Sequence, residues 1–204
     1  MGLIQTVPPA VEPVSLAEAK LHMRVDLDDD DALIQKLIEA ARRHTEDFTS
    51  RSLITQTWKL TLDRFPESLL LWRWDAWTCS NVIELPKPPL QSVTSVKYYD
   101  PDGVLQTLAA SKYLVDAVTE PGRIAPVTGE FWPATQDRIN AVEIIYVAGY
   151  GAAAANVPAG LLAAIKLLLA NWYENREATI AGSLNPVPLA VEALLRMHWV
   201  GEYP

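Results

Sequence analysis

The sequence predicts an α+β protein in which the N- and C-terminal helices form one small helical bundle with an inserted antiparallel β domain. Apolar residues recur every three to four positions in the first and last quarters, whereas they alternate with polar residues in the middle, which prolines and glycines divide into short segments. Each helical end alone would expose an apolar stripe, so we expect the two ends to pack together. The expected bundle comprises residues 1–56 and 151–204, and the expected β domain residues 57–150.

The first quarter of the chain predicts two helices. Ser15 and Glu18 have the spacing of a capping box, in which each side chain satisfies a backbone N–H group of the other residue at a helix start. A short helix is therefore expected over residues 16–24. The acidic run 28–31 precedes a second helix over about 30–49, because carboxylates are favoured at a helix N-terminus. Its apolar stripe consists of Leu33, Ile34, Leu37, Ile38, Ala41 and Phe48.

The middle of the chain predicts short antiparallel strands. Asp100, Pro101 and Gly103 give a strong turn signal, since proline presets the turn dihedral and glycine accepts a positive φ. This turn is expected to join two strands as a hairpin. The expected strands cover residues 57–63, 69–74, 82–85, 93–99, 104–108, 113–118, 123–126 and 142–147.

The last quarter predicts a helix after Pro158 that is apolar over much of its circumference. Leu161, Ile165, Leu168 and Trp172 form one stripe, and Leu162, Leu169 and Tyr173 form a second stripe beside it. Such a helix requires contacts on more than one side. It lies either at the centre of the helical core or between that core and a neighbouring subunit, which makes Leu161, Leu162, Leu169 and Tyr173 candidate interface residues. A last amphipathic helix is expected over about 188–199.

Composition excludes several classes of protein. The net charge of −8 argues against a protein whose main task is to grip phosphate backbones, because that affinity comes from dense lysine and arginine. Cys79 is the single cysteine, so we expect neither an intramolecular disulfide nor a cysteine-based zinc site, but a free thiol in a reducing compartment. Neither a signal peptide nor an uncharged apolar run of about 18 residues is visible, so no membrane association is expected.

No pattern of catalytic residues stands out. The acidic run 28–31 fits no calcium-loop frame, and His22, His44 and His198 share no metal-ligand spacing. A nucleophile elbow and a phosphate-cradling loop are also missing from the sequence. We therefore expect no enzyme, no metal and no cofactor, although residue types alone leave a catalytic carboxylate pair open.

A tryptophan group in the middle of the chain permits three interpretations. Trp72 and Trp74 share one face of the expected strand, with Arg73 between them and Trp77 nearby. The group is either part of the β-domain core or an exposed patch for another protein, because tryptophan and arginine are enriched in interface hot spots. A Trp-based carbohydrate-binding module is the third interpretation.

Taken together, the ordered motifs of the chain resemble the head–tail connector (adaptor, head-completion) proteins of tailed bacteriophages, a family also found in prophages and gene transfer agents. The resemblance begins with the motif over residues 13–20, which starts at Pro13, and extends to about residue 200. The order and spacing of the pieces carry the similarity. Further matching pieces are residues 22–26, 31–34, 40–42, 49–53, 56–58, 62–66, 84–86, 89–93, 98–103, 113, 122–124, 132–133, 148–151, 157–158 and 173–177.

The resemblance implies a structural role in the virion neck, with synthesis in the host bacterial cytoplasm. Such connectors form a ring, typically twelve-fold, beneath the portal, and they extend a channel through which double-stranded DNA passes without specific binding. They also dock the next component, a stopper or tail terminator. The C-terminal segment often docks to the portal, which here points to Leu189, Leu194, Leu195, Met197 and Trp199. A different neck or tail-completion protein of similar fold is the alternative.

Overall fold

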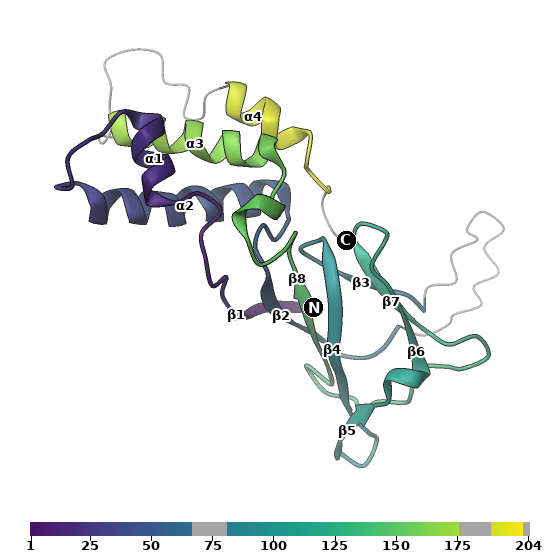
Figure 1. Ribbon diagram of the computed structural model, residues 1–204. Helices are drawn as coiled ribbons and strands as arrows, with labels where there is room; N and C mark the ends of the chain where they lie inside the picture. The colour runs from purple at the N-terminus through teal and green to yellow at the C-terminus, as the bar shows by residue number, and fades with distance from the viewer. Residues whose placement is uncertain (67–80, 176–188, 202–204) are drawn as a thin grey trace. The chain divides into compact units, whose positions relative to one another are not determined.

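The computed structural model describes residues 1–66, 81–175 and 189–201, and the chain divides into two compact units. The β unit comprises Met1–Pro8 and Gln56–Gly149, and the helical unit comprises Pro9–Thr55 and Tyr150–Pro204. Figure 1 shows the helices in one unit and the antiparallel sheets in the other. The predicted α+β class, with helical ends and an inserted antiparallel β domain, is confirmed.

The helical unit contains α1 (Leu16–Met23), α2 (Asp31–Thr49), α3 (Ala159–Glu174), α4 (Leu189–Arg196) and the short 3₁₀ helix η2 (Ala154–Asn156). The predicted capping box is confirmed, since the Ser15 hydroxyl accepts from the Glu18 amide and the Glu18 carboxylate accepts from the Ser15 amide. These bonds lower the pKa of Glu18. The ends of α1 and α2 each have a left-handed residue, Arg24 and Ser50.

The acidic run that precedes α2 closes the loop between α1 and α2. Lys20 Nζ donates to Asp28 Oδ1 at 2.5 Å and to Asp31 Oδ1 at 2.7 Å. The two carboxylates, Asp28 first, raise the pKa of Lys20. Tyr173 at the end of α3 donates its hydroxyl proton to Asp30 Oδ2 at 2.6 Å. This part of the run therefore ties α1 and α3 to the start of α2, in agreement with its interpretation as a helix start.

Helix α3 is the centre of the helical core. It packs against α1, α2 and α4, and its inward side chains have no exposed surface; they are Leu161, Ala164, Ile165, Leu168 and Leu169. Burying a leucine or isoleucine side chain contributes about 1.5–3 kcal/mol. The unusual apolarity of this helix is thus explained largely by packing inside one chain.

A buried ion network holds the chain segments before α1 and after α2. Arg42, with 4% of its surface exposed, donates from Nε to Glu12 at 2.8 Å and from Nη1 to Glu46 at 2.7 Å. Glu46 uses its other oxygen to accept from the Leu53 amide at 2.9 Å. Burial lowers the pKa of Arg42, but the contacts with Glu12 and Glu46 outweigh it and leave a net rise. The guanidinium therefore stays charged inside the unit.

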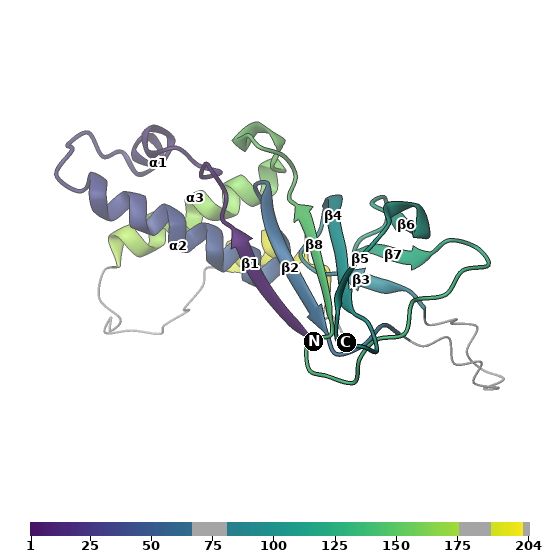
Figure 2. The same cartoon turned by 90° about the horizontal axis from the view of Figure 1, so that it is seen from below.

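The β unit contains two antiparallel sheets. The five-stranded sheet has the order β1-β2-β8-β4-β5, formed by Gly2–Val7, Gln56–Leu62, Val142–Ala148, Leu90–Tyr99 and Leu105–Leu108. The three-stranded sheet has the order β3-β7-β6, formed by Ile83–Leu85, Gly122–Pro126 and Tyr113–Asp116, which the 3₁₀ helix η1 (Ala110–Lys112) precedes. Figure 2 shows the two sheets from below. The expected strand over 69–74 lies outside the described residues.

The core of the β unit lies between its two sheets. Leu60, Ile144 and Tyr146 from the larger sheet meet Leu85 and Ile124 from the smaller one, and all five are buried. Gly122 permits this approach, because a Cβ placed there would lie 2.5 Å from Leu90 Cβ. The predicted hairpin between β4 and β5 is confirmed by a bond from the Gly103 amide to the Asp100 carbonyl, with Gly103 at a φ of +81°.

Strand β1 is the main difference from the sequence-based expectation. Residues 1–56 were all expected in the helical bundle, but Gly2–Val7 pairs antiparallel with β2 as an edge strand of the larger sheet. The side chains of Gln5 and Gln56 are hydrogen-bonded across this pair. This uncharged segment forms a strand because it pairs with β2. Its own hydrophobic pattern is too short to predict a strand.

Candidate functional site

The C-terminal segment buries one side and exposes the other. Val191 and Leu195 have no exposed surface and pack into the helical core, and Leu194 is partly buried against it. Leu189, Met197 and Trp199 remain 69%, 80% and 55% exposed. Three of the five predicted docking residues are therefore available to a partner, whereas Leu195 and most of Leu194 hold α4 onto its own unit.

The end of this segment is anchored beside Trp199. Arg51 Nε donates to the His198 carbonyl at 2.6 Å, and the Val200 amide donates to the Thr49 carbonyl at 3.3 Å. Thr49 is the last residue of α2, and Arg51 follows two residues later. Because Trp199 lies between two anchored neighbours, its indole is presented from a defined position, which reduces the entropy lost on binding.

The candidate interface residues of α3 fall into two groups. Leu161 and Leu169 are fully buried, so the structure leaves them no surface for a neighbouring subunit. Leu162 and Tyr173 are partly buried, and Tyr173 already uses its hydroxyl to bind Asp30. Of the two sequence-based interpretations of this helix, the structure thus favours the centre of the core.

A shallow, mostly apolar groove of about 400 Å³ lies between α1 and α3. Leu162 reaches it, which leaves this residue available to a partner. The remaining lining residues are His22, Ala159, Ala163, Lys166 and Leu167. The groove offers surface for packing, because its lining contains few groups that could perform chemistry.

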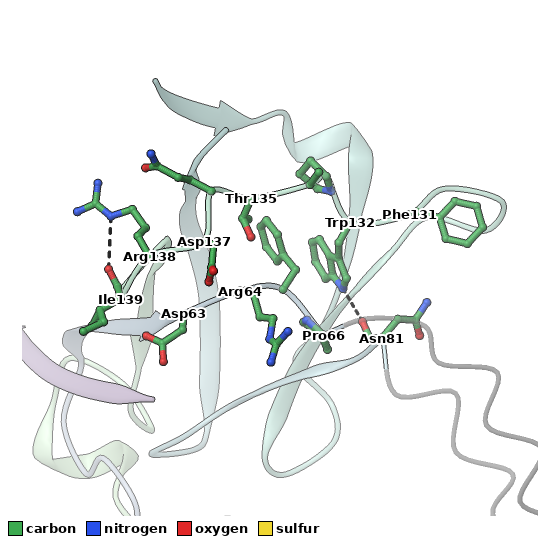
Figure 3. Close-up of a pocket in the computed structure, with 14 residues that line it drawn as sticks. Asp63, Arg64, Pro66, Asn81, Phe131, Trp132, Thr135, Asp137, Arg138 and Ile139 are labelled. Carbon is green, nitrogen blue, oxygen red and sulfur yellow. Dashed lines mark hydrogen bonds between the residues drawn. The ribbon is translucent and has the colours of Figure 1, made fainter. Parts of the chain in front are cut away.

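The β unit has a larger hollow of about 970 Å³, which Figure 3 shows in close-up. The ring of Phe65 stacks on that of Trp132, with centroids 4.7 Å apart and planes at 2°, and Trp132 Nε1 donates to the Asn81 carbonyl at 2.7 Å. Arg138 lies over the Tyr99 ring at 3.9 Å. Pro66 and Asn81 border residues outside the described ranges, so no ligand is assigned to this hollow.

The tryptophan group of the sequence analysis lies outside the described residues. The structure therefore places none of Trp72, Arg73, Trp74 and Trp77, and their three interpretations, including the carbohydrate-binding one, stay predictions.

Potential metal ligands do not gather in the part of the chain that the structure describes. Over residues 1–66, 81–175 and 189–201, no group of three or more histidine, cysteine, aspartate or glutamate side chains could hold an ion. His44 lies edge-on against Trp172, with ring centroids 5.8 Å apart, while His22 lines the groove. Within the same residues, none of the helices has both the length and the apolarity to cross a bilayer.

Sequence reasoning missed the apolar residues that face outward from β8. Val142, Ile144 and Tyr146 are fully buried, but Ile145 and Val147 between them are also apolar and only partly covered. A strand with apolar residues on both faces is typical of one that is covered on both sides. The near-continuous run Ile144-Ile145-Tyr146-Val147 was the signal that could have revealed this second face.

Comparisons with known proteins match this architecture. Residues 13–118 match the family described as phage gp6-like head-tail connector protein. A search of curated proteins gave no match.

Solved structures of gene transfer agent (GTA) particles resemble the chain over its full length. A chain in the virion of a native particle has a TM-score of 0.77 and 26% identity. Chains in the neck of an empty particle, computed with C6 symmetry, and in the neck of a native particle, computed with C12 symmetry, have TM-scores of 0.74 and 0.71 with 26% and 25% identity. Each match covers 100% of this chain and 98% of the other.

Proposed function

Since the chain belongs to the phage gp6-like head-tail connector family, we propose that it forms a ring in the neck of a phage or gene transfer agent particle. Its role is structural: it connects head and tail. The observation that carries this proposal is the similarity to GTA particle chains over 100% of this chain and 98% of theirs, with a TM-score of 0.77. A match of this extent leaves little room for an additional catalytic domain within these 204 residues.

The ring is proposed to contain twelve copies around a channel for double-stranded DNA. The C12 and C6 symmetries of the related necks support this number. The net charge of −8 supports passage of DNA without tight binding, because acidic surfaces repel the phosphate backbone.

The portal is the proposed partner of the C-terminal segment. Met197 and Trp199 combine high exposure with the anchoring of the chain at His198 and Val200. Large apolar side chains that are held in place are typical of interface hot spots. A stopper or tail terminator is proposed to bind the ring on its tail side.

The chain is proposed to act without catalysis and without a cofactor. Its family and its structural relatives are neck components, and several of the charged side chains that the structure describes form ion pairs within the fold. Arg42 with Glu12 and Glu46, and Lys20 with Asp28, are examples.

The docking proposal is tested with a double variant, Met197→Ser with Trp199→Ser, in the full-length chain. We expect portal binding to weaken at least about tenfold, because each apolar anchor contributes more than about 1 kcal/mol. Surface plasmon resonance with immobilised portal protein measures the change. Leu21→Ser is the matched control, since Leu21 is equally apolar and 81% exposed on α1.

Unchanged portal binding by the double variant would reject the docking assignment. Deletion of α4 is a poorer test, because it would also remove Val191 and Leu195 from the core of the helical unit. Cross-linking of the chain to the portal rather than to the tail-tube protein distinguishes the connector from another neck or tail-completion factor of similar fold.

A further inference from the structure

One face of the five-stranded sheet carries an apolar patch that the described residues of the β unit leave at least partly uncovered. The strand register places Ile4 and Ile145 on either side of Lys59, and Val7 and Val147 on either side of Thr57. Ile4 and Val7 are 53% and 54% exposed. These side chains point away from the core, because the alternate residues Ile144 and Tyr146 on β8 are fully buried. We call Ile4, Val7, Ile145 and Val147 the outer-face patch.

A second apolar patch lies on β6, the edge strand of the smaller sheet. Leu114 and Val118 are 57% and 93% exposed, and we call them the β6 patch. Val115 points to the opposite face of the strand, the face of the buried Tyr113, because neighbouring residues of a strand alternate sides. The loop that carries Val118 is well defined, since Asp116 accepts from the Val118 and Thr119 amides at 3.0 and 3.2 Å. The backbone bond from Val118, followed by Arg123, lowers the pKa of Asp116 to about 2, so this carboxylate stays ionised at neutral pH.

The two patches lie at opposite ends of the β unit. Figures 1 and 2 both show β1 and β2 at one end of this unit and β6 at the other. A two-fold contact uses the same surface on both copies, whereas a closed ring with more than two copies needs two different surfaces that fit each other. Two separate patches on opposite sides meet the requirement for a ring.

The charges beside the two patches are complementary. Lys59 and Lys97 outnumber Glu143 on the outer face of the larger sheet. In the smaller sheet and the segments next to β6, the carboxylates Glu84, Asp116, Glu120 and Glu130 outnumber the cations Lys112 and Arg123. The outer-face patch is therefore bordered by net positive charge and the β6 patch by net negative charge, which favours their contact and disfavours contact of either patch with itself.

We propose that the outer-face patch of one copy binds the β6 patch of the next copy, so that the β units form the head-to-tail contact of the ring. This inference rests on the proposed ring and goes beyond it, because it names the two surfaces and their polarity. The contact buries apolar side chains in its centre and pairs lysines with carboxylates at its rim, as interfaces commonly do.

Covalent cross-linking in assembled particles tests the proposal. Full-length chains carry Cys79→Ser to remove the native thiol, together with Ile4→Cys, Leu114→Cys or both, and the particles are treated with a flexible bis-maleimide. The double variant is expected to give a ladder of covalent multimers on a denaturing gel. Each single variant is expected to stay monomeric, because position 4 of one copy is expected to lie beside position 114 of its neighbour.

Two results would overturn the inference while the proposed ring stands. These are dimers from a single variant, which indicate a two-fold contact, and monomers from the double variant in particles whose necks contain the chain. If the chain is missing from wild-type particles, the proposed function itself fails and the inference fails with it.

A pair of exposed charge substitutions provides an independent measurement. Leu114→Asp should reduce the amount of chain in purified particles at least tenfold, because it places a carboxylate in the centre of the contact. Val104→Asp, at a position 55% exposed in the β4–β5 hairpin and outside both patches, should leave that amount unchanged. Circular dichroism verifies that both variants fold, and equal incorporation of the two would contradict the proposal.

Discussion

The helical unit and the β unit differ in where they place their apolar side chains. In the helical unit even the most apolar segment, α3, is enclosed by α1, α2 and α4, so that Leu161 and Leu169 have no exposed surface. Among the described residues of the β unit, the larger sheet packs against the smaller sheet on one face, and Ile145 and Val147 on its other face are only partly covered. The apolarity of a segment therefore does not by itself identify a surface for a partner. A partner surface is indicated only where few elements of the same chain pack around the apolar residues.

The two units also differ in how deeply they bury their ion pairs. The helical unit buries Arg42 between Glu12 and Glu46, whereas a β-unit pair such as Arg123 with Asp116 stays partly exposed at 50% and 33% of the side-chain surfaces. Buried pairs are costly to break, and exposed pairs contribute little. The unfolding free energy of the helical unit is therefore expected to depend more on its buried ion pairs than on its exposed ones.

The largest effect is expected from Arg42→Ala. The change leaves the buried Glu46 carboxylate without its cation, which costs about 3–5 kcal/mol of unfolding free energy. Urea denaturation measures the loss, and hydrogen exchange should show it in α2 but not in β8. Arg43→Ala, which removes a cation that is 65% exposed and paired with Glu39, is the control and should cost less than about 1 kcal/mol. Equal losses for the two variants would show that the network is not buried.

A second pair of variants compares the buried face of α3 with the outer-face patch of the larger sheet. Leu168→Ala in α3 should destabilise the isolated chain by about 3 kcal/mol, because the fully buried side chain leaves a cavity. Val147→Ala on the outer face should cost less than about 1 kcal/mol in the isolated chain but should lower its incorporation into particles. Thermal unfolding and particle composition give the two readouts. A large stability loss from Val147→Ala alone would show that its face is covered within the chain.

A smaller effect is expected inside the β unit from Tyr146→Phe. The Tyr146 hydroxyl donates to the Pro86 carbonyl at 2.8 Å in a fully buried setting. Loss of the donor leaves a buried carbonyl with one partner fewer, which costs about 1–2 kcal/mol. Urea denaturation measures the change, with Tyr98→Phe on the neighbouring strand as the comparison. Stability equal to the wild type would indicate that water replaces the lost bond.

The smallest effect is expected when acid protonates the Asp116 carboxylate, which lies next to the β6 patch. The pKa of Asp116 lies at about 2 in the folded chain, below its usual value of 3.8. A lowered pKa means that the carboxylate stabilises its loop above pH 3.8, and that this contribution is lost as the pH falls towards 2. The protection of the Val118 and Thr119 amides against hydrogen exchange, relative to their intrinsic exchange rates, should therefore fall between pH 4 and pH 2. The pH dependence should disappear in Asp116→Asn, and its persistence there would assign it to another group.

Most of the fold could be predicted from the sequence. The capping box at Ser15 and Glu18 and the turn at Asp100 to Gly103 fix local conformation through short-range hydrogen bonds, so their patterns suffice. Strand β1 could not be predicted, because its place depends on pairing with β2, more than fifty residues away. The sequence left open whether Leu161 and Leu169 lie in the core or at an interface, and it did not reveal that Leu195 is buried, since periodicity shows an apolar face but not what covers it.

Electron cryomicroscopy of the neck of assembled particles is the most direct test of the proposed ring. We expect a closed ring of this chain between portal and tail, in which each copy contacts the next through its β unit and contacts the portal near Trp199. A particle neck without this chain, or a map in which the chain occupies another joint, would contradict it.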